Sequence, residues 1–139
     1  MKKIISLTFV LFTIIVISSC KKEPGEGGTS SIKGKIITRD YQGAFFPGST
    51  FYVEYPELEQ DVYIIYGDGT TFDNRTRTSF DGSYEFNYLR KGSYQVFVYS
   101  DDTNFVAPAP SGKVVVEQKV EITKNKSDIT VPDMMIIKL

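Results

Sequence analysis

The sequence predicts an all-β fold, an antiparallel sandwich of seven to eight strands. Three observations predict it: apolar residues alternate with polar ones at a period of two, turn residues separate these segments, and no window keeps a 3.6-residue period. Aromatic residues, which favour strands, are abundant, with nine Tyr and ten Phe. About 100 residues of such segments are typical of a sandwich, and a small barrel is the alternative architecture.

Each expected strand has its own pattern. The segment 62–66 is continuously apolar, as in a central strand, whereas 75–80 is polar, as in an edge strand. Asp81 and Gly82 form a tight turn between two of the strands. The expected strands, in chain order, are 32–38, 51–55, 62–66, 75–80, 84–88, 94–99, 114–122 and a last one from 129, which Pro132 interrupts and 134–139 resumes.

The N-terminus predicts a cleavable signal. Two lysines precede an apolar run over 4–17, which is 14 residues long and shorter than the roughly 20 that a spanning helix needs. Residues 17–20 resemble a lipobox, which implies cleavage before Cys20 and attachment of fatty acyl chains such as palmitate to it. Cys20 is also the single cysteine of the chain. Multiple acyl chains give a stable membrane anchor.

This interpretation divides the chain into three parts. Residues 1–19 are the lipoprotein signal peptide, 20–31 are the lipidated cysteine and a flexible Gly/Ser-rich tether, and 32–139 are the β domain. The layout resembles lipoproteins of the Bacteroidetes, which implies lipid anchoring at the outer membrane. Both the periplasmic face and the cell surface remain open.

The centre of the β domain resembles the carboxypeptidase regulatory-like family. The resemblance rests on Thr78, Asp81-Gly82-Ser83-Tyr84-Glu85-Phe86, Leu89, Gly92-Ser93-Tyr94, Val96 and Val98. It implies a transthyretin-like (prealbumin-like) sandwich that serves as a non-catalytic module, with Tyr84, Phe86 and Tyr94 in the core. The segment 40–61 departs from the family pattern through inserted residues.

Composition excludes several functions. Removal of residues 1–19 takes away two lysines, so 14 basic residues face 17 acidic ones and the net charge is about −3, unlike that of nucleic-acid binders. The chain has no histidine, which removes the usual catalytic triads and the common zinc sites. We therefore expect no enzyme activity and no cofactor.

Two features are candidates for binding. The segment 67–74 holds Asp68, Asp73 and Asn74, oxygen ligands of the kind calcium prefers, although the same residues favour ordinary turns. Tyr63, Phe97 and Tyr99 alternate oppositely to the core set. They either form an exposed face suited to sugar or protein, or pack beneath the long loops 40–48 and 103–112, which is the interpretation we favour from the sequence.

Together these features predict a non-catalytic, lipid-anchored cell-envelope protein that acts as a binding or scaffold module in an outer-membrane or surface assembly. Its partners would be the membrane, through the anchor, and an outer-membrane protein or glycan. The alternative function is a carbohydrate- or calcium-binding surface module. A contiguous exposed aromatic strip would favour sugar, and converging Asp and Asn oxygens would favour calcium.

Overall fold

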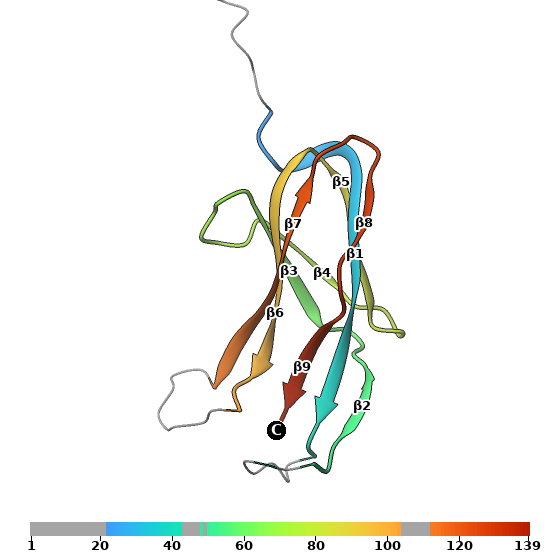
Figure 1. Ribbon diagram of the computed structural model, residues 1–139, viewed down its shortest axis with the longest axis vertical. Helices are drawn as coiled ribbons and strands as arrows, with labels where there is room; N and C mark the ends of the chain where they lie inside the picture. Colours follow the sequence, from blue (N-terminus) through green and yellow to red (C-terminus); the bar gives the residue numbers. More distant parts are fainter. Residues whose placement is uncertain (1–21, 43–47, 49, 104–111) are drawn as a thin grey trace, which may run out of the picture.

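The computed structural model describes residues 22–42, 48, 50–103 and 112–139, and these form strands and turns without a helix (Figure 1). Period-two alternation makes each strand apolar on the face that turns toward the other sheet. The strands of the described residues are β1 (Glu26–Asp40), β2 (Val53–Pro56), β3 (Asp61–Tyr66), β4 (Asn74–Arg77), β5 (Ser83–Leu89), β6 (Gly92–Asp101), β7 (Lys113–Ile122), β8 (Asp128–Thr130) and β9 (Met134–Lys138).

The strands form two packed sheets. In one sheet β1 pairs antiparallel with β2 and β5 and parallel with β8 and β9. The other sheet has the order β4-β3-β6-β7 and is antiparallel throughout. The predicted all-β sandwich is confirmed. It has nine strands in the described residues because Pro132 separates β8 from β9, and the two parallel pairs are a feature that the sequence did not predict.

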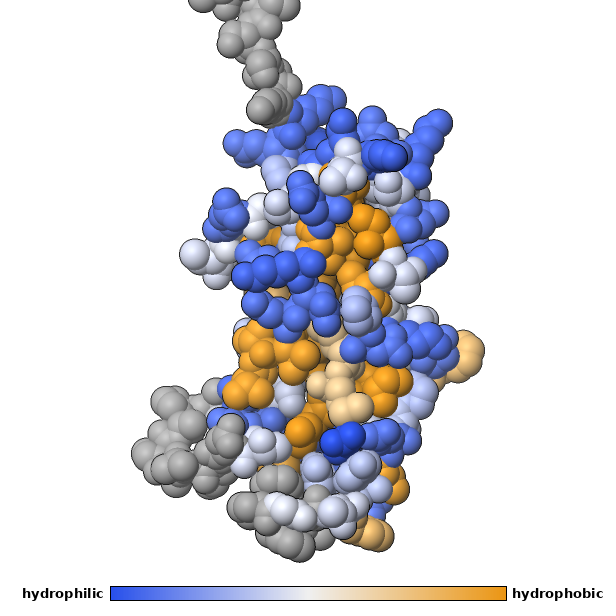
Figure 2. All heavy atoms as spheres, viewed as in Figure 1, coloured by the Kyte–Doolittle hydropathy of each residue, from blue (hydrophilic) through white to orange (hydrophobic). Residues whose placement is uncertain are grey.

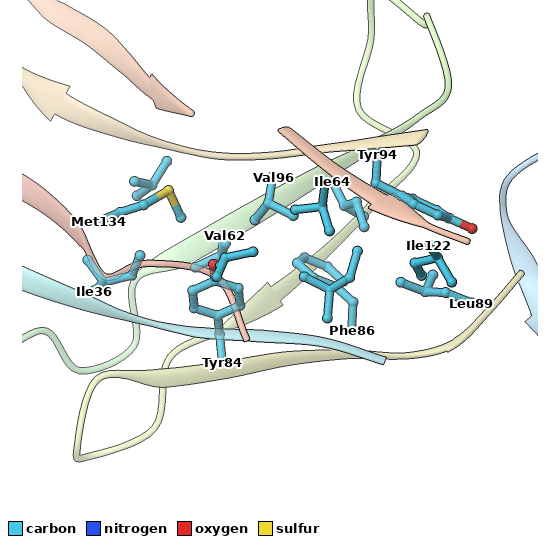
Figure 3. Packing of buried hydrophobic residues seen from close by; sticks show 14 of the residues in the cluster. Ile36, Val62, Ile64, Tyr84, Phe86, Leu89, Tyr94, Val96, Ile122 and Met134 are labelled. Carbon is cyan, nitrogen blue, oxygen red and sulfur yellow. The ribbon is translucent and has the colours of Figure 1, made fainter. Parts of the chain in front are cut away.

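The core lies between the two sheets (Figure 3). Alternate residues of β3 and β6 meet those of β1 and β5, so that Tyr84, Phe86 and Tyr94 are buried as the family resemblance implied. The buried cluster consists of Ile32, Ile36, Val62, Ile64, Tyr84, Phe86, Leu89, Tyr94, Val96, Val98, Val120, Ile122, Val131, Met134 and Ile136.

The β domain begins earlier than residue 32. Strand β1 starts at Glu26, within the segment 20–31 that the sequence assigns to the tether, and Ser30 and Ser31 are buried. Ser31 Oγ donates a 2.8 Å hydrogen bond to Asp128, and Ser30 Oγ accepts one from the backbone N–H of Ser127. Hydrogen bonds rather than apolar burial thus hold residues 26–31 in the sheet, which is why a composition without apolar side chains was misleading.

The end of β5 also departs from the expected alternation. Tyr88 has a φ of 60°, and its side chain is exposed instead of following Tyr84 and Phe86 into the core. The pairing of β1 with β5 shifts register at this point, with both Glu26 and Ser30 opposite Leu89. This bulge moves the alternation by one residue, so Leu89 takes the inward position.

The hydroxyl groups of Tyr84 and Tyr94 differ in their hydrogen bonding. Gly34 lies directly opposite Tyr84 in the β1–β5 pair, and a Cβ atom at Gly34 would lie 2.7 Å from the Tyr84 hydroxyl. That hydroxyl is buried and has no hydrogen-bond partner among the described residues, and burial raises the pKa of Tyr84. By contrast, the Tyr94 hydroxyl donates to the carbonyl of Arg90 at 2.7 Å and accepts from the N–H of Gly25 at 3.0 Å.

Removal of the hydroxyl group should change the stability of the fold differently at Tyr94 and at Tyr84. Tyr94→Phe should lower the free energy of unfolding by about 1–2 kcal/mol, because it leaves two buried backbone groups unpaired. Tyr84→Phe should be neutral or stabilising, because it removes a polar atom that is buried without a partner. Urea unfolding followed by circular dichroism measures both, and equal losses for the two variants would contradict this account.

Candidate ligand-binding face

The outer face of the β4-β3-β6-β7 sheet carries a cluster of aromatic rings. Tyr63 of β3 lies directly opposite Phe97 of β6, and Tyr99 follows two residues along β6 on the same face. Because the neighbours of these residues, Val62 and Val98, point into the core, the strand alternation turns the three rings outward. The predicted separation of these rings from the core set is confirmed.

A fourth ring, Phe72, completes what we call the aromatic face: Tyr63, Phe72, Phe97 and Tyr99. The rings of Tyr63 and Phe97 are stacked, with centroids 5.2 Å apart and an interplanar angle of 18°. Phe72 lies 5.0 Å from Tyr63 and Tyr99 lies 5.7 Å from Tyr63, measured between ring centroids. Such contacts orient the rings against one another and restrict their motion.

The aromatic face is open to solvent at its two ends. Phe72 is 53% exposed and Tyr99 is 45% exposed, and both contact Tyr63, whereas Phe97, which contacts Tyr63 and Tyr99, is buried. Tyr99 is flanked by Val115 of β7, which lies directly opposite it and is 52% exposed. Tyr99 is thus exposed and Phe97 is not, and because residues 43–47, 49 and 104–111 of the loops lie outside the described part of the chain, the packing of these rings beneath the loops stays a prediction.

Charged side chains flank the aromatic face. Arg75 of β4 lies opposite Tyr63, and both Arg75 and Arg77 contact Asp61, at 3.4 Å and 2.9 Å. The hydrogen bond and charge of Asp61 raise the pKa of Arg77 above its usual value. On the other side Glu117 lies opposite Phe97. The rings thus form an apolar strip between two borders of paired charges, Arg75 and Arg77 with Asp61 on one side and Glu117 with Lys119 on the other, and a polar rim is typical of binding surfaces.

Sequence reasoning missed Phe72 because this residue lies in the segment 67–74, which was interpreted only through its oxygen atoms. The alternation rule that found the other three rings does not apply in a loop. The backbone N–H of Asp73 donates to the carbonyl of Ile64 at 2.9 Å, which brings this loop alongside β3 and Phe72 onto Tyr63.

The calcium candidates are engaged in the loop itself. Asp73 Oδ2 accepts a 2.7 Å hydrogen bond from the N–H of Tyr66, and Asn74 Oδ1 accepts one from the N–H of Arg75. The structure does not gather Asp68 with them into a ligand set, since no group of three or more acidic, His or Cys side chains in the described ranges lies close enough to hold a metal ion. Asp68 lies in a turn, whereas Asp73 directly precedes β4 and Asn74 is its first residue, so the side-chain oxygens of Asp73 and Asn74 serve the local backbone.

A buried polar cluster lies at another part of the β1-containing sheet. Glu57 is buried and accepts hydrogen bonds from Thr38 of β1 and, at 2.8 Å, from Lys138 of β9. Burial lowers the pKa of Lys138, but the hydrogen bond and charge of Glu57 outweigh this effect and raise it. The carboxylate is fully partnered, so we assign this cluster to joining β9 and the loop after β2 to β1.

Cys20, the predicted lipidation site, and the signal peptide 1–19 lie outside the described residues. The described part of the chain also contains no helix of the length and apolarity that a membrane crossing requires. Comparison of the sequence with protein-family models and with curated proteins found no match. The resemblances to Bacteroidetes lipoproteins and to the carboxypeptidase regulatory-like family therefore stay predictions.

Proposed function

We propose that this chain is a non-catalytic, lipid-anchored binding module of the bacterial outer membrane, and that its aromatic face binds carbohydrate. The observation that carries the proposal is the strip of four contacting rings with exposed ends at Phe72 and Tyr99. Flat apolar ring surfaces complement the C–H faces of sugar rings, and rings fixed by mutual packing lose little conformational entropy on binding.

Carbohydrate is favoured over calcium because the candidate oxygens of Asp73 and Asn74 already accept backbone hydrogen bonds. A scaffolding role toward an outer-membrane protein is the second candidate. It is favoured by Val115, which extends the apolar strip beyond the rings, and by the charged borders at Arg75 and Glu117. Either partner would use the same face, so variants of the rings test both.

Removal of the exposed rings should weaken binding to polysaccharide. Affinity electrophoresis in gels that contain xylan, starch, β-glucan or polygalacturonate should show retardation by at least one polysaccharide. Phe72→Ala and Tyr99→Ala should each raise the dissociation constant derived from that retardation about fivefold, because each lost ring contact is worth about 1 kcal/mol.

Phe80→Ala is the matched control, because Phe80 is exposed to solvent and lies in the turn after β4, away from the aromatic face. This variant should bind as the unmodified protein does. Equal binding by all three variants, or the absence of retardation in every polysaccharide, would contradict the carbohydrate proposal and leave the protein partner as the remaining candidate for this face.

The anchor is tested separately at the residue that would carry it. The intact protein should incorporate labelled palmitate, and mass spectrometry of the membrane extract should find a mature chain that starts at residue 20. Cys20→Ser should abolish the label, because acylation needs the thiol. Ser19→Ala is the control and should retain the label, because alanine is also a small residue before the cleavage point. An unmodified Cys20 thiol in the membrane extract would refute the anchor.

A further inference from the structure

Strand β7 is an open sheet edge of unusual length for this protein. It has ten residues, contains no proline or glycine, and pairs with β6 alone among the strands of the described residues. The other edge strands of the described residues are short or interrupted: β2 and β4 have four residues each, β5 has a bulge at Tyr88, and Pro132 separates β8 from β9. Long edges with unpaired backbone groups are sites where another strand adds.

Apolar side chains accompany this edge. Val114 and Val115 are both exposed, and Val116 is only partly buried against the core. Figure 2 shows apolar surface along the middle of the molecule, where Figure 1 places β7 on one side and β9 on the other. A strand added to β7 would remove this apolar surface from water as well as pair the backbone.

The side chains of β7 are complementary to a second, antiparallel copy of the same strand. With a two-fold axis through Gln118 and perpendicular to the sheet, directly opposed residues have numbers that sum to 236. On the outer face Glu117 then lies opposite Lys119 of the second copy, and this pair occurs twice by symmetry. On the inner face Val116 lies opposite Val120, and Val114 opposite Ile122.

Neighbouring registers place like charges on the axis or shorten the overlap. An axis at Glu117 places that carboxylate against its own copy, and the Lys113–Glu121 pairs of that register would compete with the ion pair of Lys113 with Asp101 in each chain. An axis at Lys119 places the two ammonium groups together. Like charges directly opposite each other destabilise a strand pair, and opposite charges stabilise it by up to about 1 kcal/mol each. An axis at Val120 pairs Lys119 with Glu121, but it overlaps only the residues 118–122 of the strand.

We propose that two copies of this chain associate through β7, with Gln118 on the two-fold axis. The two β4-β3-β6-β7 sheets then join into one continuous sheet, an isologous arrangement in which the same patch serves both partners. The aromatic faces of both copies lie on the same side of that sheet. The N-terminal ends leave at opposite ends of the pair, so lipid-anchored copies would lie with β7 along the membrane. The proposal does not depend on carbohydrate binding.

The register is tested by cross-linking the full chain in its own membrane. Gln118→Cys brings two thiols face to face on the axis, where the Cα separation of an antiparallel pair, about 4.5–5.5 Å, suits a disulfide. Mild oxidation should convert most of the protein into a linked dimer. Glu85→Cys, on the exposed outer face of the other sheet, is the matched control and should not become cross-linked.

A charge swap distinguishes this register from chance contact. Adding Lys119→Glu to Gln118→Cys should lower the cross-linked fraction several-fold, because two pairs of carboxylates then face each other. Adding Glu117→Lys as well restores both pairs and should restore the cross-link. Within one chain the two groups form only an exposed 3.8 Å pair, so the fold should tolerate the changes, and thermal unfolding of each variant checks this.

Sedimentation velocity of the detergent-extracted protein without an added cysteine provides an independent reading and should show a dimer. Cross-linking of Gln118→Cys no greater than that of Glu85→Cys would overturn the proposal. So would a cross-linked fraction that the double charge swap does not restore, or a purely monomeric species in sedimentation.

Discussion

The structure depends on the pairing of β1 on both of its edges. This strand of 15 residues is antiparallel to β5 and β2 and parallel to β8 and β9, so four strands lose their partner if β1 is displaced. Ile32 and Ile36 project from it into the core, and Gly34 between them makes room for the ring of Tyr84. The β4-β3-β6-β7 sheet packs on the apolar side of β1 and β5. The position of the aromatic face on the outer side of that sheet therefore also depends on β1.

Much of this fold was predictable, because apolar alternation directly reflects burial in a two-layer protein. The strands around Val62, Tyr94 and Val120 follow that rule. Residues 26–31 do not, since their strand is stabilised by hydrogen bonds such as that between Ser31 and Asp128, which a polar sequence does not reveal. The bulge at Tyr88 depends on a single backbone angle, which the alternation of residue types cannot predict.

The aromatic face also combines residues that strand alternation predicts with one residue that it does not predict. Strand parity alone separates Tyr63, Phe97 and Tyr99 from the core, since a strand has only two faces. Phe72 reaches the cluster through a loop whose path is determined by the hydrogen bond between Asp73 and Ile64. The loop geometry that brings in this ring also engages the oxygens of Asp73 and Asn74, so it supports the aromatic face and weakens the case for a calcium site.

The start of the fold has a consequence for the proposed anchor. Gly25 is held by Tyr94 and by a hydrogen bond from the N–H of Arg90 to its carbonyl, at 2.9 Å. Five residue steps separate Cys20 from Gly25, and even a fully extended chain covers only about 18 Å over that length. A lipidated Cys20 would therefore hold the sandwich close to the membrane surface. Ligands that reach the aromatic face must then be accessible in that layer, as glycans and membrane proteins are.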